Sequence, residues 1–395
     1  MIPLSVPNLK GNEINYVTNA LVAEWVSTGG AYINQFEKDL ADYVLTHSAV
    51  AVSSGTSGLH LALLEAGVSA HEHVIVPTLT FIAAVNPIKY VNAHPIFMDC
   101  DDSLCLDVAK LEKFLKTECD FINNQLIFRE TSRPITAIIA VHIFGNLVDM
   151  LSLMTLARKF NLQVIEDSTE ALGSYMLIDG AKKFAGTFGD FGVFSFNGNK
   201  IITTGGGGMV LAKDKEKLSH IKYLSTQAKD DELNYIHNEI GYNYRMTNVQ
   251  AAIGVAQLEQ IEKFVEIKKN NYHLYKQLLA TLDEVTLLDF REDIRPNYWF
   301  YSLAFQERID VARIITALNS QGIGSRPVWG LIHEQKPYKN DYSFEIEKAY
   351  KYVSSIVNIP CSSNLTDKEI RYVVSVIKEI LFNETNGQRI KRLNN

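Results

Sequence analysis

The chain has few cysteines and no metal-binding pattern. Its 395 residues include four cysteines, and none of them forms a CxxC pair or stands at a zinc-like interval from histidines. Reduced thiols of the cytosol are the simplest interpretation of this usage, and we expect no metal site. The four residues are Cys100, Cys105, Cys119 and Cys361.

Basic residues and long apolar runs are also lacking. Lys and Arg number 38 against 45 Asp and Glu, a net charge of -7, which argues against a dedicated nucleic-acid binder. No run reaches the roughly 18 apolar residues that cross a bilayer, and residues 1–5 do not begin a secretory signal. We therefore expect a cytoplasmic protein with neither nucleic-acid nor membrane partners.

The 47% hydrophobic content supports a buried core, and the length favours two or three domains, or one large α/β domain with an appendage. Short apolar runs alternate with helical stretches from about Ala49 to Leu211, which is typical of a mainly parallel sheet covered on both faces. Residues 247–280 have a long helical pattern, and short strands mix with helices from about Val285 onward. We predict a large α/β domain over residues 1–247 and a smaller α+β domain over 248–395. Residues 119–134 are predicted to be an irregular surface excursion.

Two strand ends carry candidate ligand contacts. Residues 53–58, Ser-Ser-Gly-Thr-Ser-Gly, follow a strand and open a helix, where N–H groups can hold a phosphate. An ordinary turn with a serine cap explains the same residues equally well. Asp167 follows the strand at 162–165, at the sheet edge where α/β proteins bind ligands, although a helix-capping aspartate is the more common case.

The stretch Gly189–Lys200 is the most informative. A strand delivers Ser195, a turn carries Lys200, and four glycines follow at 205–208, which would let backbone approach a bulky ligand. Most lysines are solvated surface groups, but a glycine-lined turn is an unusual setting for a surface charge.

These three elements fit pyridoxal phosphate, which requires a lysine, an aspartate at its ring nitrogen and a phosphate cup. The chain resembles fold-type I pyridoxal-phosphate transferases, and among them the DegT/DnrJ/StrS nucleotide-sugar aminotransferases, closest to the legionaminic-acid-pathway branch. The resemblance implies a large domain with a mainly parallel seven-stranded sheet. It rests on segments along nearly the whole chain: residues 2–5, 25–29, 77–81, 141–145, 166–170, 195–200, 241–246 and 326–329.

The resemblance assigns the cofactor site. It implies that Lys200 links to the cofactor aldehyde and later moves the proton, that Asp167 keeps the ring nitrogen protonated, and that Phe81 stacks on the ring. The phosphate would be held by Ser195 and by the backbone of residues 55–57, which are Gly55, Thr56 and Ser57. Pyridoxamine phosphate would be the form between half-reactions.

The resemblance further implies a homodimer with shared active sites, in which Asn243 reaches the neighbouring subunit's phosphate. Ser27, Thr28, Arg326 and Trp329 lie in segments that contact the nucleotide sugar in relatives.

Glu170 departs from the glutamine of many relatives, and its carboxylate would repel the cofactor's phenolate unless protonated or hydrogen-bonded elsewhere. Two histidines leave alternatives open. His142 is either a structural histidine or a contact near the cofactor, and His333 is either a surface residue, which we favour, or a residue that approaches the substrate. Trp25 and Trp299 are interpreted as packing residues.

The activity implied is transfer of an amino group from L-glutamate to the C4 ketone of a UDP-linked 2-acetamido-4-keto-6-deoxy sugar. Three alternatives remain. One is a GDP- or dTDP-linked 3- or 4-keto-6-deoxy sugar as acceptor. Another is a sugar dehydratase on the same fold, although the best-known of these replace the lysine with histidine. The third is a pyridoxal-binding regulator or degenerate scaffold, which the complete set of Asp167, Ser195 and Lys200 disfavours.

Overall fold

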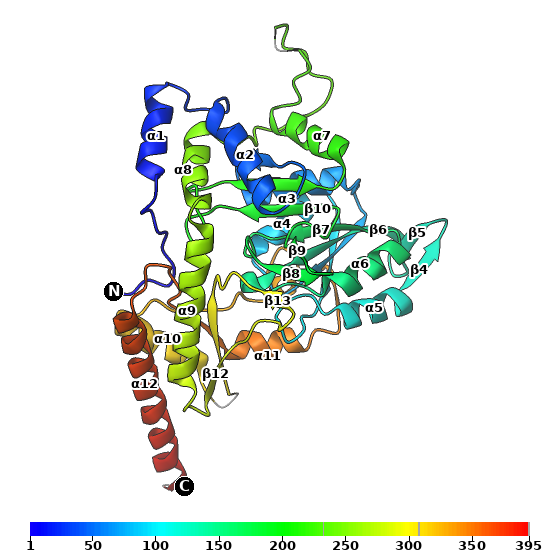
Figure 1. Cartoon of the computed structure of the whole chain (residues 1–395). Helices are drawn as coiled ribbons and strands as arrows, with labels where there is room; N and C mark the ends of the chain where they lie inside the picture. The colour runs from blue at the N-terminus through cyan, green and yellow to red at the C-terminus, as the bar shows by residue number, and fades with distance from the viewer. Residues whose placement is uncertain (232, 307–308, 394–395) are drawn as a thin grey trace.

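A large mixed sheet forms the centre of the protein, with helices on both of its faces (Figure 1). The computed structural model describes residues 1–231, 233–306 and 309–393, and for residues 383–393 it describes the backbone alone. The strand order is β1-β11-β10-β7-β6-β2-β3-β16, with the hairpin β4–β5 attached to β6. The bounds are β1 Val50–Val52, β2 His73–Pro77, β3 His94–Met98, β4 Cys119–Ile122, β5 Gln125–Phe128, β6 Arg133–Val141, β7 Gln163–Asp167, β10 Phe191–Ser195, β11 Gly208–Ala212 and β16 Tyr342–Phe344.

The predicted mainly parallel α/β sheet is present, but the predicted number of strands is wrong. The strands from β10 through β7, β6, β2 and β3 to β16 are all parallel, and β11 runs antiparallel to both of its neighbours. The sheet has ten strands and not seven. Two of the additional strands, β4 and β5, lie in the stretch 119–134 that we predicted to be irregular.

A second, four-stranded antiparallel sheet lies in the C-terminal part, in the order β12-β14-β17-β15. Its strands are β12 Val285–Leu287, β14 Tyr301–Phe305, β15 Arg326–Pro327 and β17 Ile356–Ile359. A third sheet joins β13 (Ile294–Arg295) to β8 (Tyr175–Ile178) and β9 (Ala181–Phe184). Thus β13 and β16, which follow residue 248 in the chain, pair with strands that precede it. The boundary at 247/248 stays a prediction.

The predicted long helical stretch at 247–280 is present as two helices. They are divided at Glu259 and Gln260, and Thr247 caps the first of them together with Gln250. Among the described residues, no helix combines the length and apolar character needed to cross a membrane. The helices are α1 Glu13–Val22, α2 Ala31–Tyr43, α3 Gly55–Glu65, α4 Asn86–Tyr90, α5 Val108–Thr117, α6 Met150–Lys159, α7 Lys215–Ser225, α8 Asn248–Leu258, α9 Ile261–Leu279, α10 Val311–Ser320, α11 Lys348–Ser355 and α12 Asp367–Leu393, with short 3₁₀ turns η1 Ile82–Ala84, η2 Ile143–Gly145 and η3 Ile332–Glu334.

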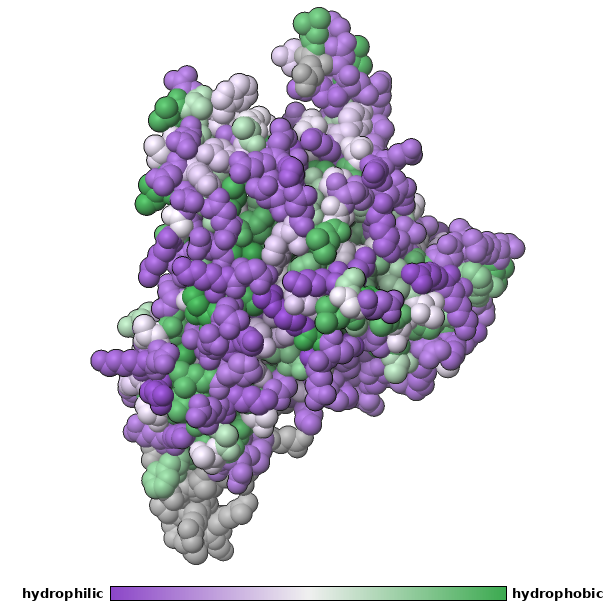
Figure 2. All heavy atoms as spheres, viewed as in Figure 1, coloured by the Kyte–Doolittle hydropathy of each residue, from purple (hydrophilic) through white to green (hydrophobic). Residues whose placement is uncertain are grey.

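Exposed apolar side chains occur on α1 and on the arm formed by residues 226–231 and 233–241, which projects beyond α7 (Figures 1 and 2). Leu21 and Val22 of α1 are exposed, as are Leu233, Tyr235 and Ile240 of the arm. Solvent exposure of so many large apolar side chains is typical of a protein–protein contact surface.

A buried carboxylate joins α11 to the large sheet. Asp99 follows β3, is fully buried, and accepts hydrogen bonds from Lys110 and from the N–H groups of residues 347–349 at the start of α11. Burial alone would raise the pKa of Asp99, but the Lys110 ammonium and these N–H groups outweigh it and hold the pKa below its ordinary value.

Replacing Asp99 with alanine is expected to lower the free energy of unfolding at pH 7 by about 3–5 kcal/mol, because it leaves the N–H groups at the start of α11 without their buried acceptor and removes one partner of the Lys110 ammonium. Because the folded-state pKa is depressed, the contribution is complete above about pH 4 and is lost as the pH falls further. Asp102→Ala is the control, since its side chain is 79% exposed and should cost less than about 1 kcal/mol. Urea denaturation measures both, and equal losses would contradict the assignment.

Candidate active site

A cavity of about 400 Å³ lies at the C-terminal ends of β7 and β10. Its wall combines the first turn of α3, the ends of the two strands, the turn after β10, and two tryptophans from the C-terminal part of the chain. Eight predicted site residues line it: Gly55, Thr56, Phe81, Asp167, Glu170, Ser195, Lys200 and Trp329.

The fold brings Asp167 to this cavity through the sheet register. Asp167 is the last residue of β7 and stands beside Val193 of β10. Its side chain is buried and accepts a hydrogen bond from the Thr169 N–H at 3.1 Å. Burial raises the pKa of Asp167, so a cationic ring nitrogen placed against this carboxylate would favour its ionised form.

Lys200 stands on the turn that follows β10, and its side chain is 13% exposed. Its Nζ lies 3.5 Å from Glu170 Oε1 and 4.3 Å from the ring centroid of Trp299. The amine is therefore held inside the cavity between a carboxyl and an aromatic face.

The first turn of α3 forms a cradle beside Ser195. A Cβ at Gly55 would lie 2.9 Å from the Cβ of Ser195, so only glycine lets the helix start come this close. No hydrogen bond described for this part of the chain uses the N–H of Gly55 or Thr56. Two open N–H groups at a helix N-terminus, next to a hydroxyl, fit a phosphate group.

Ser57 has a different task from the predicted one. Its N–H donates to Ser54 Oγ at 3.0 Å, and its hydroxyl accepts from the Ser54 N–H, also at 3.0 Å, so both groups are used in capping α3. Ser57 does not line the cavity. We therefore assign Ser57 to the helix cap and keep Gly55 and Thr56 as the candidate phosphate contacts.

Glu170 is buried and already hydrogen-bonded. Its Oε2 accepts from the Phe144 N–H at 2.9 Å, while Oε1 faces Lys200. Burial raises the pKa of Glu170 to about 7, against the opposing effect of the Lys200 charge. A carboxyl would be tolerated beside a phenolate if it were protonated or hydrogen-bonded elsewhere. Both conditions are thus available to Glu170.

His142 belongs to a buried network next to the cavity. Its Nδ1 accepts from the Val148 N–H at 3.2 Å, so the proton lies on Nε2, which donates to Glu166 Oε2 at 2.9 Å. Glu166 also accepts N–H bonds from Gly186, Phe188 and Gly189. Of the two alternatives for His142, this geometry favours the structural role.

Besides Ser57, four predicted site residues do not line the cavity of their own chain: Ser27, Thr28, Asn243 and Arg326. All four are exposed.

Phe81 and Trp329 both line the cavity, and their ring centroids lie 6.5 Å apart. His333 is partly buried, with its Nδ1 2.7 Å from Thr78 Oγ1.

The sequence interpretation was wrong for Trp25 and incomplete for Trp299. Trp25 is 61% exposed and thus does not pack in the core, whereas Trp299 is buried and also lines the cavity. Trp299 stands more than 90 positions after Lys200, so no local pattern could connect the two residues. Thr80, Thr169, Asn197 and Asn199 were also missed as lining residues.

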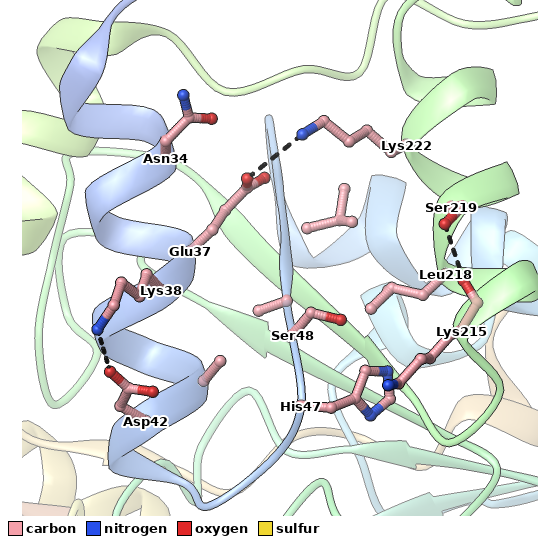
Figure 3. Close-up of a pocket in the computed structure, with 13 residues that line it drawn as sticks. Asn34, Glu37, Lys38, Asp42, His47, Ser48, Lys215, Leu218, Ser219 and Lys222 are labelled. Carbon is pink, nitrogen blue, oxygen red and sulfur yellow. Dashed lines mark hydrogen bonds and ion pairs between the residues drawn. The ribbon is translucent and has the colours of Figure 1, made fainter.

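A second hollow, of about 570 Å³, lies between α2 and α7 and contains none of the predicted site residues (Figure 3). Its charges are mostly paired: Lys38 bonds Asp42, and Lys222 approaches Glu37 at 3.7 Å. Glu37 also accepts from the Ala51 N–H at 2.8 Å and pairs with Arg245, which donates to the Ala51 carbonyl. The hollow contains none of the three elements that meet in the first cavity, which are Lys200, Asp167 and the start of α3.

Comparison with known proteins identifies the family. The profile of the DegT/DnrJ/EryC1/StrS aminotransferase family matches residues 7–378. The chain belongs to this family. The family assignment, the fold-type I fold and the aminotransferase class predicted from the sequence are confirmed, and the family depends on pyridoxal phosphate.

Among curated family members, the chain is 37% identical to a GDP-perosamine synthase of Escherichia coli O157:H7, covering 96% of this chain and 98% of that protein. It is 36% identical to a GDP-perosamine synthase of Caulobacter vibrioides, with the same coverage. A UDP-4-amino-4,6-dideoxy-N-acetyl-beta-L-altrosamine transaminase of Campylobacter jejuni is 29% identical over 96% and 98%. The fold matches the crystal structure of the aminotransferase TlmJ of Streptoalloteichus hindustanus, at a TM-score of 0.88 and 24% identity, covering 98% and 100%.

Two finer expectations are not supported by these family members. The legionaminic-acid branch is not confirmed, and the most similar of these relatives are named for a GDP-linked and not a UDP-linked sugar. Short motifs such as residues 195–200 and 326–329 identify the family but do not determine the nucleotide.

Replacing Glu170 with glutamine is expected to keep most of the activity, because an amide can hold the same position without the charge. In the cofactor-free protein, the pKa of Glu170 is higher in the folded state than in the unfolded state. Its contribution to the free energy of unfolding is therefore complete below about pH 4.3 and is lost as the pH rises through about 7. The variant should therefore gain stability relative to the wild type between pH 5 and pH 8.

Denaturation at a series of pH values tests this, with the exposed Glu112→Gln as a control whose stability difference should stay flat. Complete loss of aminotransferase activity in Glu170→Gln would show that the role of Glu170 is misassigned.

Proposed function

We propose that this family member transfers an amino group from L-glutamate to the C4 keto group of a GDP-linked 4-keto-6-deoxy sugar. The proposal is carried by one observation, the convergence of Lys200, Asp167 and the Gly55–Ser195 cradle on a single cavity. The choice of GDP follows the two relatives named GDP-perosamine synthase. It replaces the UDP-linked acceptor, which becomes an alternative.

The residues around the cavity fit pyridoxal phosphate. When bound, this cofactor supplies an aldehyde that accepts an amino group and a ring that takes up the electron pair released at the reacting carbon. The N–H groups of Gly55 and Thr56 and the Ser195 hydroxyl would hold its phosphate, and Asp167 would hold its ring nitrogen in the protonated state.

Lys200 is the proposed acid–base group as well as the attachment point. With Nζ inside the cavity, it could remove a proton from the substrate carbon that bears the nitrogen and deliver it to the carbon on the other side of that nitrogen. Phe81 would cover the ring face, and Trp329 at the mouth would contact the sugar nucleotide with Ser27, Thr28 and Arg326. The donor would give up its amino group in a first half-reaction, and the acceptor would receive it in a second. Two separate half-reactions predict ping-pong kinetics.

We propose a homodimer in which Asn243 completes the neighbouring subunit's phosphate site. Three features support this arrangement: Asn243 is exposed, it lies outside its own cavity, and apolar side chains cover α1 and the arm at 226–241. The expected acceptor contacts of Ser27 and Thr28 lie directly after α1, which would then border the shared site.

Lys200→Ala is expected to abolish turnover and to lose the visible absorbance that borohydride bleaches in the wild type, since no other amine stands in the same position. Absorbance spectra before and after borohydride, with peptide mass spectrometry, provide the measurement. Reduction at a different lysine in the wild type would contradict the assignment. Lys213→Ala is a suitable control, because Lys213 bonds the Phe188 carbonyl and does not line the cavity.

Acceptor preference is tested by incubating the protein with glutamate and GDP-, dTDP- and UDP-linked keto sugars. We expect kcat/KM for the GDP-linked 4-keto-6-deoxy sugar to exceed the others by at least roughly tenfold. Mass spectrometry of the product distinguishes an amino sugar from the product of a dehydratase. A preference for the UDP-linked sugar would restore the original expectation.

Shared sites are tested by mixing subunits. Neither Lys200→Ala nor Asn243→Ala alone should bind the cofactor normally, but a mixed dimer has one site with both native residues. We expect about one site in each mixed dimer to bind the cofactor with normal affinity. If Asn243 acts within its own chain, mixing would restore nothing.

A further inference from the structure

Trp299 contacts Lys200 in two ways. Its ring centroid lies 4.3 Å from Lys200 Nζ, and its indole N–H donates a 2.7 Å hydrogen bond to the carbonyl of Asn199, the residue just before the lysine. One side chain therefore contacts both the amine of Lys200 and the peptide carbonyl that precedes this residue. The side chain is itself 3% exposed, so these contacts are shielded from water.

Trp299 is in turn held at both ends of its own backbone. Its N–H donates to Asn297 Oδ1 at 2.9 Å, and its carbonyl accepts from Lys268 Nζ at 3.0 Å. Lys268 is buried on α9, and burial lowers its pKa. Its ammonium has the carbonyls of Trp299 and Cys361 as acceptors, so the tryptophan backbone is anchored from the C-terminal part of the chain.

Asn297 connects this anchor to the loop that carries Glu170. Its Nδ2 donates to the carbonyls of Glu170 and Leu172, each at 2.9 Å. The fit is close: a Cβ at Gly145 would lie only 2.0 Å from Asn297 Oδ1. Residues 297–299 therefore tie the loop after β7 to the turn after β10, which are the two segments that carry the reactive groups.

We propose that Trp299 is a positioning residue for Lys200. A lysine side chain has a flexible stem, and an amine that acts on a cofactor must be held within a narrow range of positions. An indole face attracts an ammonium group, and the N–H bond to Asn199 fixes the point from which the stem starts. The inference rests on the proposed function in one respect, that Lys200 is the amine that links to the cofactor.

Two substitutions separate the two contacts. Trp299→Phe keeps an aromatic face but removes the N–H donor, whereas Trp299→Leu removes both. Trp25→Leu is the matched control, because Trp25 is 61% exposed and does not line the cavity.

The experiment measures the rate at which the cofactor attaches to Lys200, in addition to the rate of turnover. Cofactor-free protein is mixed with pyridoxal phosphate, and the rate at which the visible absorbance appears is measured, with borohydride trapping and mass spectrometry of the Lys200 peptide. We expect a roughly tenfold slower rate for Trp299→Leu, a smaller reduction for Trp299→Phe, and a rate within about twofold of the wild type for Trp25→Leu. In steady state, kcat should fall with both substrates while KM changes little.

Attachment rates within twofold of the wild type in both Trp299 variants would overturn the proposal. So would an increase in KM for the sugar alone, which would make Trp299 a substrate contact. If Trp299→Leu fails to fold, as judged by circular dichroism, the Phe variant decides. Failure of the proposed function is distinct, because the wild type itself would then not form the Lys200 adduct.

Discussion

The parallel pairing of β7 with β10 is the constraint on which the site depends. Because the two strands run side by side in the same direction, their carboxyl ends emerge together, and Asp167 is brought beside the strand that delivers Ser195 and Lys200. β11 then returns antiparallel along β10 and places its glycine at 208 against the start of α3. A Cβ there would lie 2.7 Å from the Ser54 carbonyl oxygen. The sheet thus fixes the spacing of the aspartate, the lysine and the helix start before any ligand is bound.

Much of this could be predicted from the sequence, because the strands and their following residues are contiguous in the chain. The apolar runs at 73–76, 135–141 and 162–165 predicted β2, β6 and β7 to within two residues at each end. Recognisable local patterns also indicated the site, because Asp167, Gly55 and Lys200 each lie at or just after the end of a strand. The hairpin β4–β5 was missed, although its turn residues Asn123 and Asn124 both have positive φ values of the kind a two-residue hairpin turn requires.

The sequence could not predict contacts between residues that lie far apart in the chain. Trp299 and Trp329 reach the cavity from the C-terminal part of the chain, and β16 joins the large sheet from position 342 onward. Each contact depends on how the two parts of the chain pack together, which leaves no periodic signal in either segment. The same applies to Trp25, whose exposure contradicts the usual burial of tryptophan. The nucleotide preference belongs to this class too, since it depends on side chains outside the conserved motifs of the cofactor site.

The pairing of Glu37 and Arg245 around Ala51 has a consequence beyond the hollow in Figure 3. β1 is the last strand at its side of the large sheet, and an outermost strand normally offers its free backbone groups as a template for another chain. Here a carboxylate and a guanidinium occupy the N–H and the carbonyl of the middle residue of β1. The charged pair thereby occupies the backbone groups of Ala51 that a further strand would need for pairing at this edge.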